Sequence, residues 1–336
     1  MQPDRTPRVL IRYDLPMTTQ TPSDPGPELP DVQMHLHRPN DPGEGVIVEN
    51  RICTRSSKSA GFVRHLVVDI SGTDLAGRFR VGQSFGTIPP GVTEKGRSHR
   101  VRLYSLSCPT AGEDGQGTLI STTVKRLIDE HWETKKLFLG LASNWLCDLQ
   151  VGTKIPITGP AGKRFLLPKR PEEHDYIFFA TGTGIAPFRG MIHELLSSGV
   201  QSQIVLIMGA PYATDLLYHE ELEALAEQHA HFTYLTALSR ELQLDGGVPI
   251  YVQGRLETHR DQLGTLLRTD RALIYACGLS GMELGIFRGL HQVLEGQHLE
   301  RYLKLDPEIA GDPASWTRRM VNRQVAPTRR IFLEVY

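Results

Sequence analysis

A chain of 336 residues is too long for one hydrophobic core of ordinary size and predicts two domains. Its 40% of hydrophobic and 22% of charged residues are typical of a globular protein, and the formal net charge of −1 argues against nucleic-acid binding through overall charge. No apolar run reaches the roughly 20 residues of a membrane-spanning helix, so no membrane span is expected.

The cysteines indicate a reducing compartment. Cys53, Cys108, Cys147 and Cys277 are scattered along the chain, without the close spacing of zinc or iron–sulfur ligands. Scattered thiols are typical of proteins that work in a reducing environment. The first residues also lack the basic and apolar regions of a signal peptide. We therefore expect a cytoplasmic protein with no metal site.

Residues 1–40 are expected to form a flexible arm. They hold eight of the 22 prolines and show no periodic apolar pattern, as in segments that do not bury a core. A short apolar stretch at residues 9–11 is a candidate docking patch. The role of the arm stays open.

Residues 41–170 show the pattern of a small antiparallel β-barrel. Short apolar runs are separated by clusters of Gly, Pro and Asp, which is typical of strands joined by turns. One helical insert is expected near residues 144–149. The expected strands are 45–53, 63–69, 83–88, 100–105, 118–124 and 154–158.

Residues 171–336 alternate between strand and helix patterns, which indicates a parallel, doubly wound sheet. Ligands of such sheets bind at the carboxyl ends of the strands. The expected strands are 176–180, 204–208, 232–235 and 273–277, and the expected helices are 188–196, 220–228, 255–268 and 282–294.

A glycine-rich turn follows the first strand of this second domain and opens its first helix. It reads TGTGIAPFR at residues 181–189. Glycines let the backbone approach a pyrophosphate closely, and the N-terminus of a helix favours its negative charge. The motif predicts a dinucleotide site that includes Thr183 and Gly184.

Four motifs, in this order, resemble the plant-type ferredoxin–NADP⁺ reductase family. They are RLYS at 102–105, TGTGIAPFR at 181–189, CGLSGME at 277–283 and EVY at 334–336. The resemblance implies an FAD-binding barrel at 41–170 and an NADP(H)-binding α/β domain at 171–336. It also implies an oxidoreductase that passes electrons between NADP(H) and a one-electron carrier protein, ferredoxin or flavodoxin.

The resemblance assigns three groups of residues to FAD. Arg102 would pair with the pyrophosphate, because a guanidinium matches phosphate oxygens. Tyr104 would stack on the flavin ring, and Ser105 would place its hydroxyl near flavin N5. The adenosine half would lie on Thr123, Val124 and Lys125, and a phosphate would meet the helix N-terminus at Leu141, Ala142 and Ser143.

The chain departs from the family pattern in its FAD motifs. Ala142 stands where the family usually has Cys, and Asp129 stands where a Tyr usually stacks on the adenine. His131 and Trp132 are candidate replacements for that Tyr. What stacks on the adenine stays open.

The second domain carries the implied nicotinamide nucleotide site. Ser239, Arg240, Tyr251 and Gln253 would contact the 2′-phosphate and adenine, although Pro249 stands where the family often has a Lys. A 2′-phosphate requires such cationic and hydroxyl donors, whereas a carboxylate selects the free ribose of NADH. Pro211 and residues 216–218 would form the wall of the pocket, and Gly278 and Leu279 would border the nicotinamide.

The implied catalytic residues are Ser105, Cys277, Glu334 and Tyr336. Cys277 would lie beside nicotinamide C4. Tyr336 would cover the flavin ring until the nicotinamide displaces it, and Glu334 would position the nicotinamide and relay protons.

The chain has no iron–sulfur cysteine set and no flavodoxin-like domain, so a separate carrier is implied. A basic rim would attract an acidic carrier. Its candidate residues are Arg97, Arg100, Lys125, Arg126, Arg318, Arg319 and Arg323. A reductase component that feeds an oxygenase shares every motif, and a non-enzymatic flavin redox sensor is a third hypothesis. The direction of electron flow, the carrier and the oligomeric state stay open.

Overall fold

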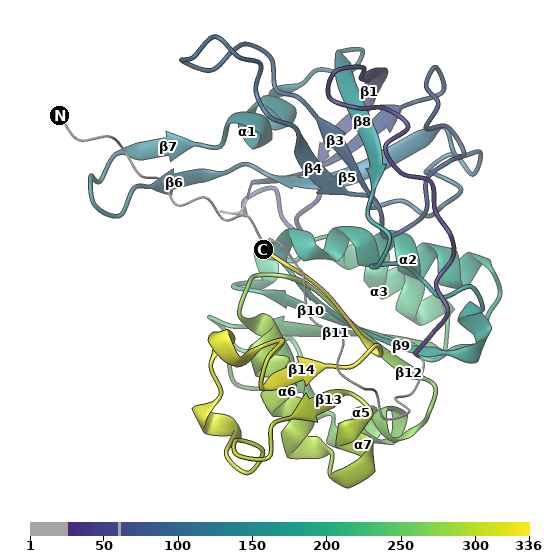
Figure 1. Ribbon diagram of the computed structural model, residues 1–336, viewed down its shortest axis with the longest axis vertical. Helices are drawn as coiled ribbons and strands as arrows, with labels where there is room; N and C mark the ends of the chain where they lie inside the picture. Colours follow the sequence, from purple (N-terminus) through teal and green to yellow (C-terminus); the bar gives the residue numbers. More distant parts are fainter. Residues whose placement is uncertain (1–25, 60–61) are drawn as a thin grey trace.

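The computed structural model describes residues 26–59 and 62–336, which form two domains stacked along the long axis of the molecule (Figure 1). The apolar patch expected at residues 9–11 lies outside this part of the chain. No helix within it is long and apolar enough to cross a membrane.

An antiparallel barrel forms the first domain, as expected. Its strands are rich in Val, Ile and Thr, which suit a pleated and half-buried surface. The strands lie in the order β4-β3-β8-β1-β2-β5, and Leu106 after β4 bridges to Thr122 of β5, so the two edges meet and the sheet closes. The strands are β1 (Gly43–Ile52), β2 (Val63–Asp69), β3 (Ser84–Thr87), β4 (Arg102–Ser105), β5 (Leu119–Lys125) and β8 (Lys154–Ala161).

A β-hairpin that the sequence analysis missed follows β5. Its strands are β6 (Ile128–Glu130) and β7 (Leu137–Leu139), and it projects away from the barrel (Figure 1). The chain then enters the short helix α1 (Leu141–Asp148), which begins three residues before the expected insert.

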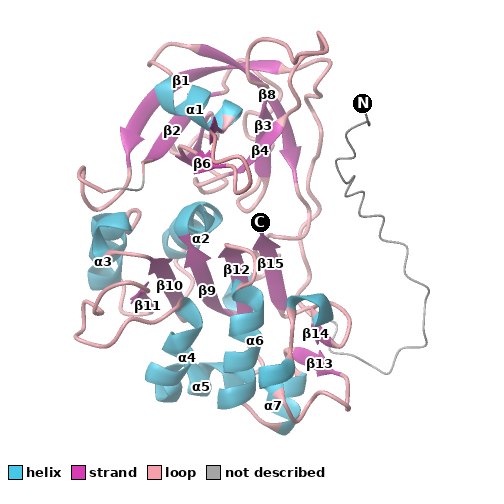
Figure 2. Ribbon diagram, turned by 90° about the vertical axis from the view of Figure 1, so that its left-hand side faces the viewer, coloured by secondary structure: helices cyan, strands magenta, loops and turns pink. Residues whose placement is uncertain are grey.

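A five-stranded parallel sheet with helices on both faces forms the second domain. The strand order is β11-β10-β9-β12-β15. Figure 2 shows α2 and α3 on the face toward the barrel and α4, α5 and α6 on the other face. The main elements are β9 (Asp175–Thr181), α2 (Ile185–Ser197), β10 (Ile204–Ala210), α3 (His219–Gln228), β11 (Phe232–Leu238), α4 (Arg255–Thr258), α5 (Arg260–Arg268), β12 (Ala272–Gly278), α6 (Met282–Val293), α7 (Gly296–Glu300), β13 (Leu303–Leu305), β14 (Val325–Pro327) and β15 (Ile331–Val335).

The long helix expected at 255–268 is two helices, α4 and α5. The break is at His259, whose backbone angles (φ −118°, ψ 37°) lie outside the helical region. Strand β15 was not among the expected strands, yet it completes the sheet beside β12.

Residues 26–40 do not hang free, as the expected flexible arm would. The backbone N–H of Lys169 donates to the Glu28 carbonyl (2.9 Å), and that of His35 donates to the Pro160 carbonyl (2.9 Å). These backbone bonds hold the segment on the end of β8 and on the chain that leaves it. We keep 41–170 and 171–336 as proposed limits of the two domains.

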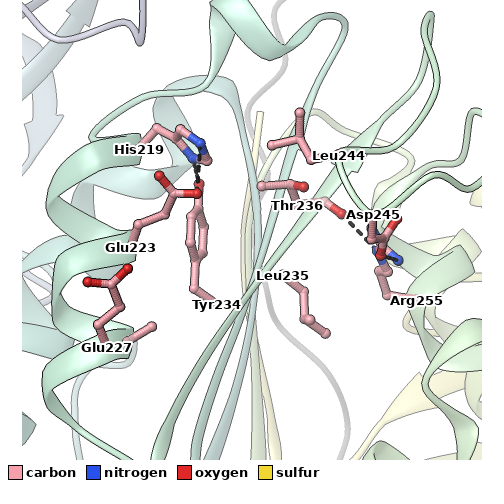
Figure 3. Close-up of a pocket in the computed structure, with 10 residues that line it drawn as sticks. His219, Glu223, Glu227, Tyr234, Leu235, Thr236, Leu244, Asp245 and Arg255 are labelled. Atoms are coloured by element: carbon pink, nitrogen blue, oxygen red, sulfur yellow. Dashed lines mark hydrogen bonds and ion pairs between the residues drawn. The ribbon is translucent and has the colours of Figure 1, made fainter.

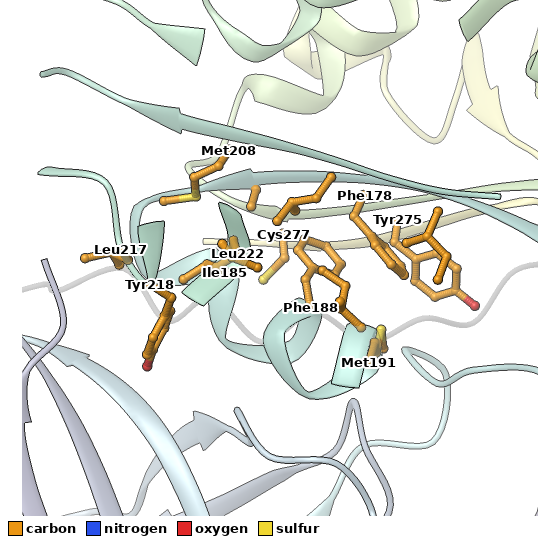
Figure 4. Close-up of a cluster of buried hydrophobic side chains, with 14 of the residues drawn as sticks. Phe178, Ile185, Phe188, Met191, Met208, Leu217, Tyr218, Leu222, Tyr275 and Cys277 are labelled. Atoms are coloured by element: carbon orange, nitrogen blue, oxygen red, sulfur yellow. The ribbon is translucent and has the colours of Figure 1, made fainter. Parts of the chain in front are cut away.

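An aromatic core packs on the middle of the second sheet. Phe178 of β9 stacks on Phe188 of α2 with ring centroids 4.9 Å apart, and Tyr275 of β12 stacks on Phe332 of β15 at 4.3 Å. Figure 4 shows Cys277 and Tyr218 in the same cluster, with the Tyr218 ring at its edge directed toward the barrel. This packing holds β15 in a defined register against β12.

Candidate active site between the two domains

Cys277 and Glu334 are register partners at the ends of β12 and β15. The glycine-rich turn packs directly on this point, because a Cβ on Gly184 would lie 2.1 Å from the Cys277 carbonyl oxygen. Any other residue at 184 would push the turn away from β12. The turn expected to hold a pyrophosphate and the Cys expected beside the nicotinamide are therefore neighbours.

The Glu334 carboxyl meets Ser105 across the domain interface. Burial raises the pKa of Glu334, and the Ser105 side chain offsets only part of that rise. The Oε2 atom is inaccessible to solvent and has no hydrogen-bond partner among the described residues. Burial also raises the pKa of the Cys277 thiol, and the neighbouring Glu334 raises it further. A protonated thiol and a carboxyl ready to take a proton thus lie side by side.

We expect Glu334→Gln to stabilise the protein at pH 8 and to have little effect below pH 4.5. A carboxyl whose pKa is raised by folding carries a cost while it is ionised, and the cost disappears as pH falls through the folded pKa toward the unfolded value. Urea unfolding at several pH values checks this, with the exposed Glu308→Gln as the control. Equal stabilisation at all pH values would contradict a buried, ionisable Glu334.

Tyr336 lies over the glycine-rich turn. Its hydroxyl is 2.8 Å from Thr183 Oγ1, its N–H donates to the Gly278 carbonyl (3.0 Å), and its carbonyl accepts from the Ser280 N–H (3.0 Å). The residue as a whole is 62% exposed. Its backbone is therefore fixed, while the residue remains accessible to a planar partner.

The residues expected to read a 2′-phosphate gather at the ends of β10 and β11. The Arg240 N–H donates to the Pro211 carbonyl (3.0 Å), and the residue before Tyr251 donates to the Leu238 carbonyl (2.9 Å), which places Tyr251 beside Ser239. The Arg240 side chain is exposed and forms no ion pair with the described residues. A free guanidinium beside an exposed Tyr251 ring suits a phosphorylated nucleotide.

Gln253 lies on the α6 side of the sheet, and Leu279 directly follows β12. Gln253 packs on α6, where a Cβ on Gly285 would be 2.8 Å from its amide carbon. The Leu279 N–H donates to Thr181 Oγ1 (2.8 Å), and its side chain is exposed. Leu279 is thus placed beside the glycine-rich turn, whereas Gln253 is partly used by packing.

Arg102 and Tyr104 lie on β4 of the barrel. Among the described residues, Arg102 Nη1 donates only to the carbonyls of Arg100 (3.1 Å) and Val101 (3.3 Å), and the side chain is exposed. Tyr104 packs on Phe85, and burial raises the pKa of its phenol to about 12. The guanidinium has unused donors, and Tyr104 stays neutral.

The N-terminus of α1 offers amides at Leu141, Ala142 and Ser143 that have no partner within residues 26–59 and 62–336. No side chain of these residues caps the helix at Gly140. Ser143 Oγ accepts from the Leu127 N–H (3.2 Å) and donates to the Gly140 carbonyl, so its hydroxyl is already used. The amides, rather than the hydroxyl, are available to a phosphate.

The side chains of Thr123 and Val124 do not form an open ligand surface. Thr123 Oγ1 lies 2.6 Å from the Tyr218 hydroxyl at the domain interface, and Val124 is buried in the barrel core. Only Lys125 of this group is exposed. Tyr218 itself, expected in the wall of the nucleotide pocket, is buried against the barrel instead, because it fills the seam between the domains.

The β6–β7 hairpin adds an apolar face that the sequence analysis did not use. Ile128 lies opposite Leu139, and Glu130 lies opposite Leu137, so three of these four side chains are apolar on one face. All three are more than half exposed. The signal in the sequence was the apolar run at 137–139, separated from Ile128 by a charged turn.

A pocket of about 520 Å³ lies elsewhere, between α3 and β11 (Figure 3). Glu223 and Asp245 give it an acidic lining, and Asp245 pairs with Arg255 (2.8 Å). None of the residues predicted from sequence lines it.

Known proteins resemble this chain over both domains. Residues 178–286 match the family model of the oxidoreductase NAD-binding domain. Ferredoxin–NADP reductase of Spirulina sp. is 38% identical over 266 residues, which cover 77% of this chain and 89% of that protein. The leaf-type chloroplastic isozyme of Nicotiana tabacum is also 38% identical, over 76% of this chain and 70% of its own length. This chain belongs to the ferredoxin–NADP reductase family.

The family uses FAD and NADP(H), so this member is a flavin-dependent oxidoreductase. Its fold is also that of the ferredoxin–NADP⁺ reductase of Plasmodium falciparum, with a TM-score of 0.65, 21% identity, and coverage of 90% of this chain and 99% of the other. The expected barrel and α/β fold is confirmed.

Proposed function

We propose that this reductase passes electrons between NADP(H) and ferredoxin, with the reaction centre formed by Ser105, Cys277, Glu334 and Tyr336. The observation that supports this most is the meeting of Ser105 from the barrel with Glu334 from the second sheet. Neither domain by itself contains all four residues of the proposed reaction centre. A reaction between a flavin on one domain and a nicotinamide on the other requires such a junction.

The residues present fit FAD. The free amides of α1 and the unused donors of Arg102 suit its pyrophosphate, and the uncovered apolar face of the β6–β7 hairpin suits its adenine. A two-stranded hairpin is only marginally stable alone, so a flat partner on that face would stabilise it. When bound, FAD supplies the exchange between two-electron hydride and single electrons.

The chain itself binds, orients and moves protons. Arg240, Ser239 and Tyr251 hold the phosphorylated adenosine end, and the turn at Thr183 and Gly184 holds the pyrophosphate. Cys277 and Leu279 border the nicotinamide. Glu334 accepts or donates a proton at its unpaired Oε2, and Tyr336 excludes water from the flavin until the nicotinamide arrives. One of the similar solved structures is the Plasmodium falciparum enzyme with 2′P-AMP, which agrees with this choice of nucleotide.

The carrier is proposed to be an acidic ferredoxin or flavodoxin. Of the candidate basic rim, Arg126 is paired with Asp148 and lies over the Phe62 ring, so it is not free. Arg318 is paired more loosely with Glu283 (3.8 Å). The exposed members without an ion pair to the described residues are Arg97, Arg100, Lys125, Arg319 and Arg323. We also propose a cytoplasmic location, since all four cysteines are free thiols.

Anaerobic titration of the purified protein tests the function. NADPH should bleach the visible flavin absorbance, and reduction of an acidic ferredoxin should slow steeply as ionic strength rises, whereas reduction of ferricyanide should not. A protein that binds no flavin would refute the function. A ferredoxin rate indifferent to salt would refute the docking surface alone.

A further inference from the structure

Arg189 of α2 is a buried cation that contacts both domains. Its Nη1 donates to Glu113 Oε1 (2.5 Å) and to the Ser107 carbonyl (3.0 Å), and its Nε lies 2.8 Å from Glu221 Oε1. Glu113 and Ser107 belong to the barrel domain, whereas Glu221 lies on α3. The side chain is only 8% exposed. One guanidinium therefore joins carboxylates from the two domains.

The backbones are in contact at the same place. A Cβ on Gly190 would lie 2.3 Å from the Cys108 carbonyl oxygen, so α2 rests directly on the chain that leaves β4. The neighbouring residue Arg189 fixes the orientation of α2 against this segment of the barrel domain. A shift of α2 would break its bonds to Glu113 and Ser107.

These contacts connect the two halves of the candidate active site. On the barrel side, Ser107 lies two residues after Ser105. On the other side, α2 begins directly after Gly184, which packs on the Cys277 carbonyl. The hydrogen-bonded backbone of α2 keeps the distance between Gly184 and Arg189 nearly constant. The contacts of Arg189 with the barrel therefore fix the position of Ser105 relative to Cys277.

The two carboxylates that surround residue 189 favour an arginine over a lysine at this position. Burial alone would raise the pKa of Glu113, but the charge and the hydrogen bond of Arg189, together with the bond from Ser121, outweigh burial and the pKa is lowered. The pKa of Glu221 is lowered too, since bonding to His193 and the charge of Arg189 exceed the effect of its burial. Both carboxylates are therefore ionised, and the guanidinium donates hydrogen bonds to Glu113 and Ser107 while its Nε lies at ion-pair distance from Glu221. A lysine has a single point charge and cannot keep all three contacts.

We propose that Arg189 is a positioning residue that sets the angle between the two domains and thereby the approach of the nicotinamide to the flavin. The proposal rests on the proposed function, because the consequence of the angle is the stacking of two cofactors. Arg189 touches neither cofactor site directly. It acts through α2 and through the segment after β4.

The test compares two ligands of the Arg189→Lys holoenzyme. The fragment 2′P-AMP would occupy only the adenosine site within the α/β domain, so its Kd should stay within about twofold of the parent value. Mixing with NADPH should give a much weaker long-wavelength charge-transfer absorbance and a reduction of the flavin slowed by about 10- to 100-fold, because a misplacement near 1 Å has effects of this size. Flavin content should be unchanged.

Arg271→Lys is the matched control. Arg271 also pairs with a carboxylate, Asp175 (3.1 Å), and donates to the Glu172 carbonyl, but all three residues lie in the second domain at the opposite end of its sheet. This variant should keep the charge-transfer band. If Arg189→Lys loses its flavin, Glu221→Gln replaces it in the same comparison, since it removes one charge of the cluster and leaves the barrel unchanged.

An undiminished charge-transfer band and normal flavin reduction in the Arg189 or Glu221 variant would overturn the proposal. A comparable loss in Arg271→Lys would overturn it too, because the effect would then follow from general destabilisation. Failure of the proposed function would differ from both results, since the parent protein itself would show no flavin or no charge-transfer band with NADPH.

Discussion

Tyr336→Ser is expected to raise the ratio of kcat/KM for NADH to that for NADPH by about tenfold or more. In the proposed function the tyrosine ring competes with the nicotinamide for one face of the flavin, and its hydroxyl bond to Thr183 (2.8 Å) holds it over the turn. Ring stacking contributes about 0.5–1.5 kcal/mol and a hydrogen bond about 1 kcal/mol. Because 1.4 kcal/mol corresponds to a factor of ten, removing the competitor has an effect of this size.

NADH should gain more than NADPH because it lacks the 2′-phosphate contacts that help NADPH displace the ring. NADP⁺ should bind more tightly to the variant, while NADPH turnover should not rise in parallel, since a more strongly held nicotinamide leaves more slowly. Steady-state kinetics with both nucleotides and difference spectra with NADP⁺ measure these effects. Tyr336→Phe is the control, because it keeps the ring and removes only the bond to Thr183. An unchanged ratio in Tyr336→Ser would mean that this ring does not cover the flavin.

Arg240→Ala is expected to weaken NADPH binding by about 10- to 100-fold and to leave NADH nearly unaffected. The loss of a charge-assisted contact to phosphate costs about 1.5–3 kcal/mol. Arg240 is exposed at the end of β11, next to the Pro211 backbone, and Pro249 stands where the family often has a second cation. At position 249 there is therefore no second cation that could bind the 2′-phosphate in place of the Arg240 guanidinium.

The Kd of both nucleotides, measured by equilibrium titration, checks this second prediction. Arg170→Ala is a suitable control because Arg170 is also exposed but lies before β9, at the opposite end of the sheet. It tests the effect of losing one positive charge without losing the proposed contact. A similar loss of affinity for NADH and NADPH in Arg240→Ala would show that this side chain does not read the 2′-phosphate.

Local sequence was sufficient for most of the secondary structure. The expected strand at 63–69 matches β2, and the motif at 181–189 runs from the end of β9 through a turn into α2, because strand alternation and glycine conformations act over a few neighbouring residues. The hairpin at β6–β7 escaped detection since its strands have only three residues each. So short a run does not show a period.

The sequence by itself determined the order of the two domains, the family, and the motifs of the nucleotide site, because these depend on residue type and spacing along the chain. Only the tertiary structure decided which of these residues meet. Glu334 pairs with Cys277, which lies 57 positions earlier, and faces Ser105 of the other domain. Thr123 lies on the expected strand, and its side chain bonds Tyr218 of the other domain. Such contacts depend on strand register and on how two cores pack together, and neither is determined by the few residues on each side of a motif.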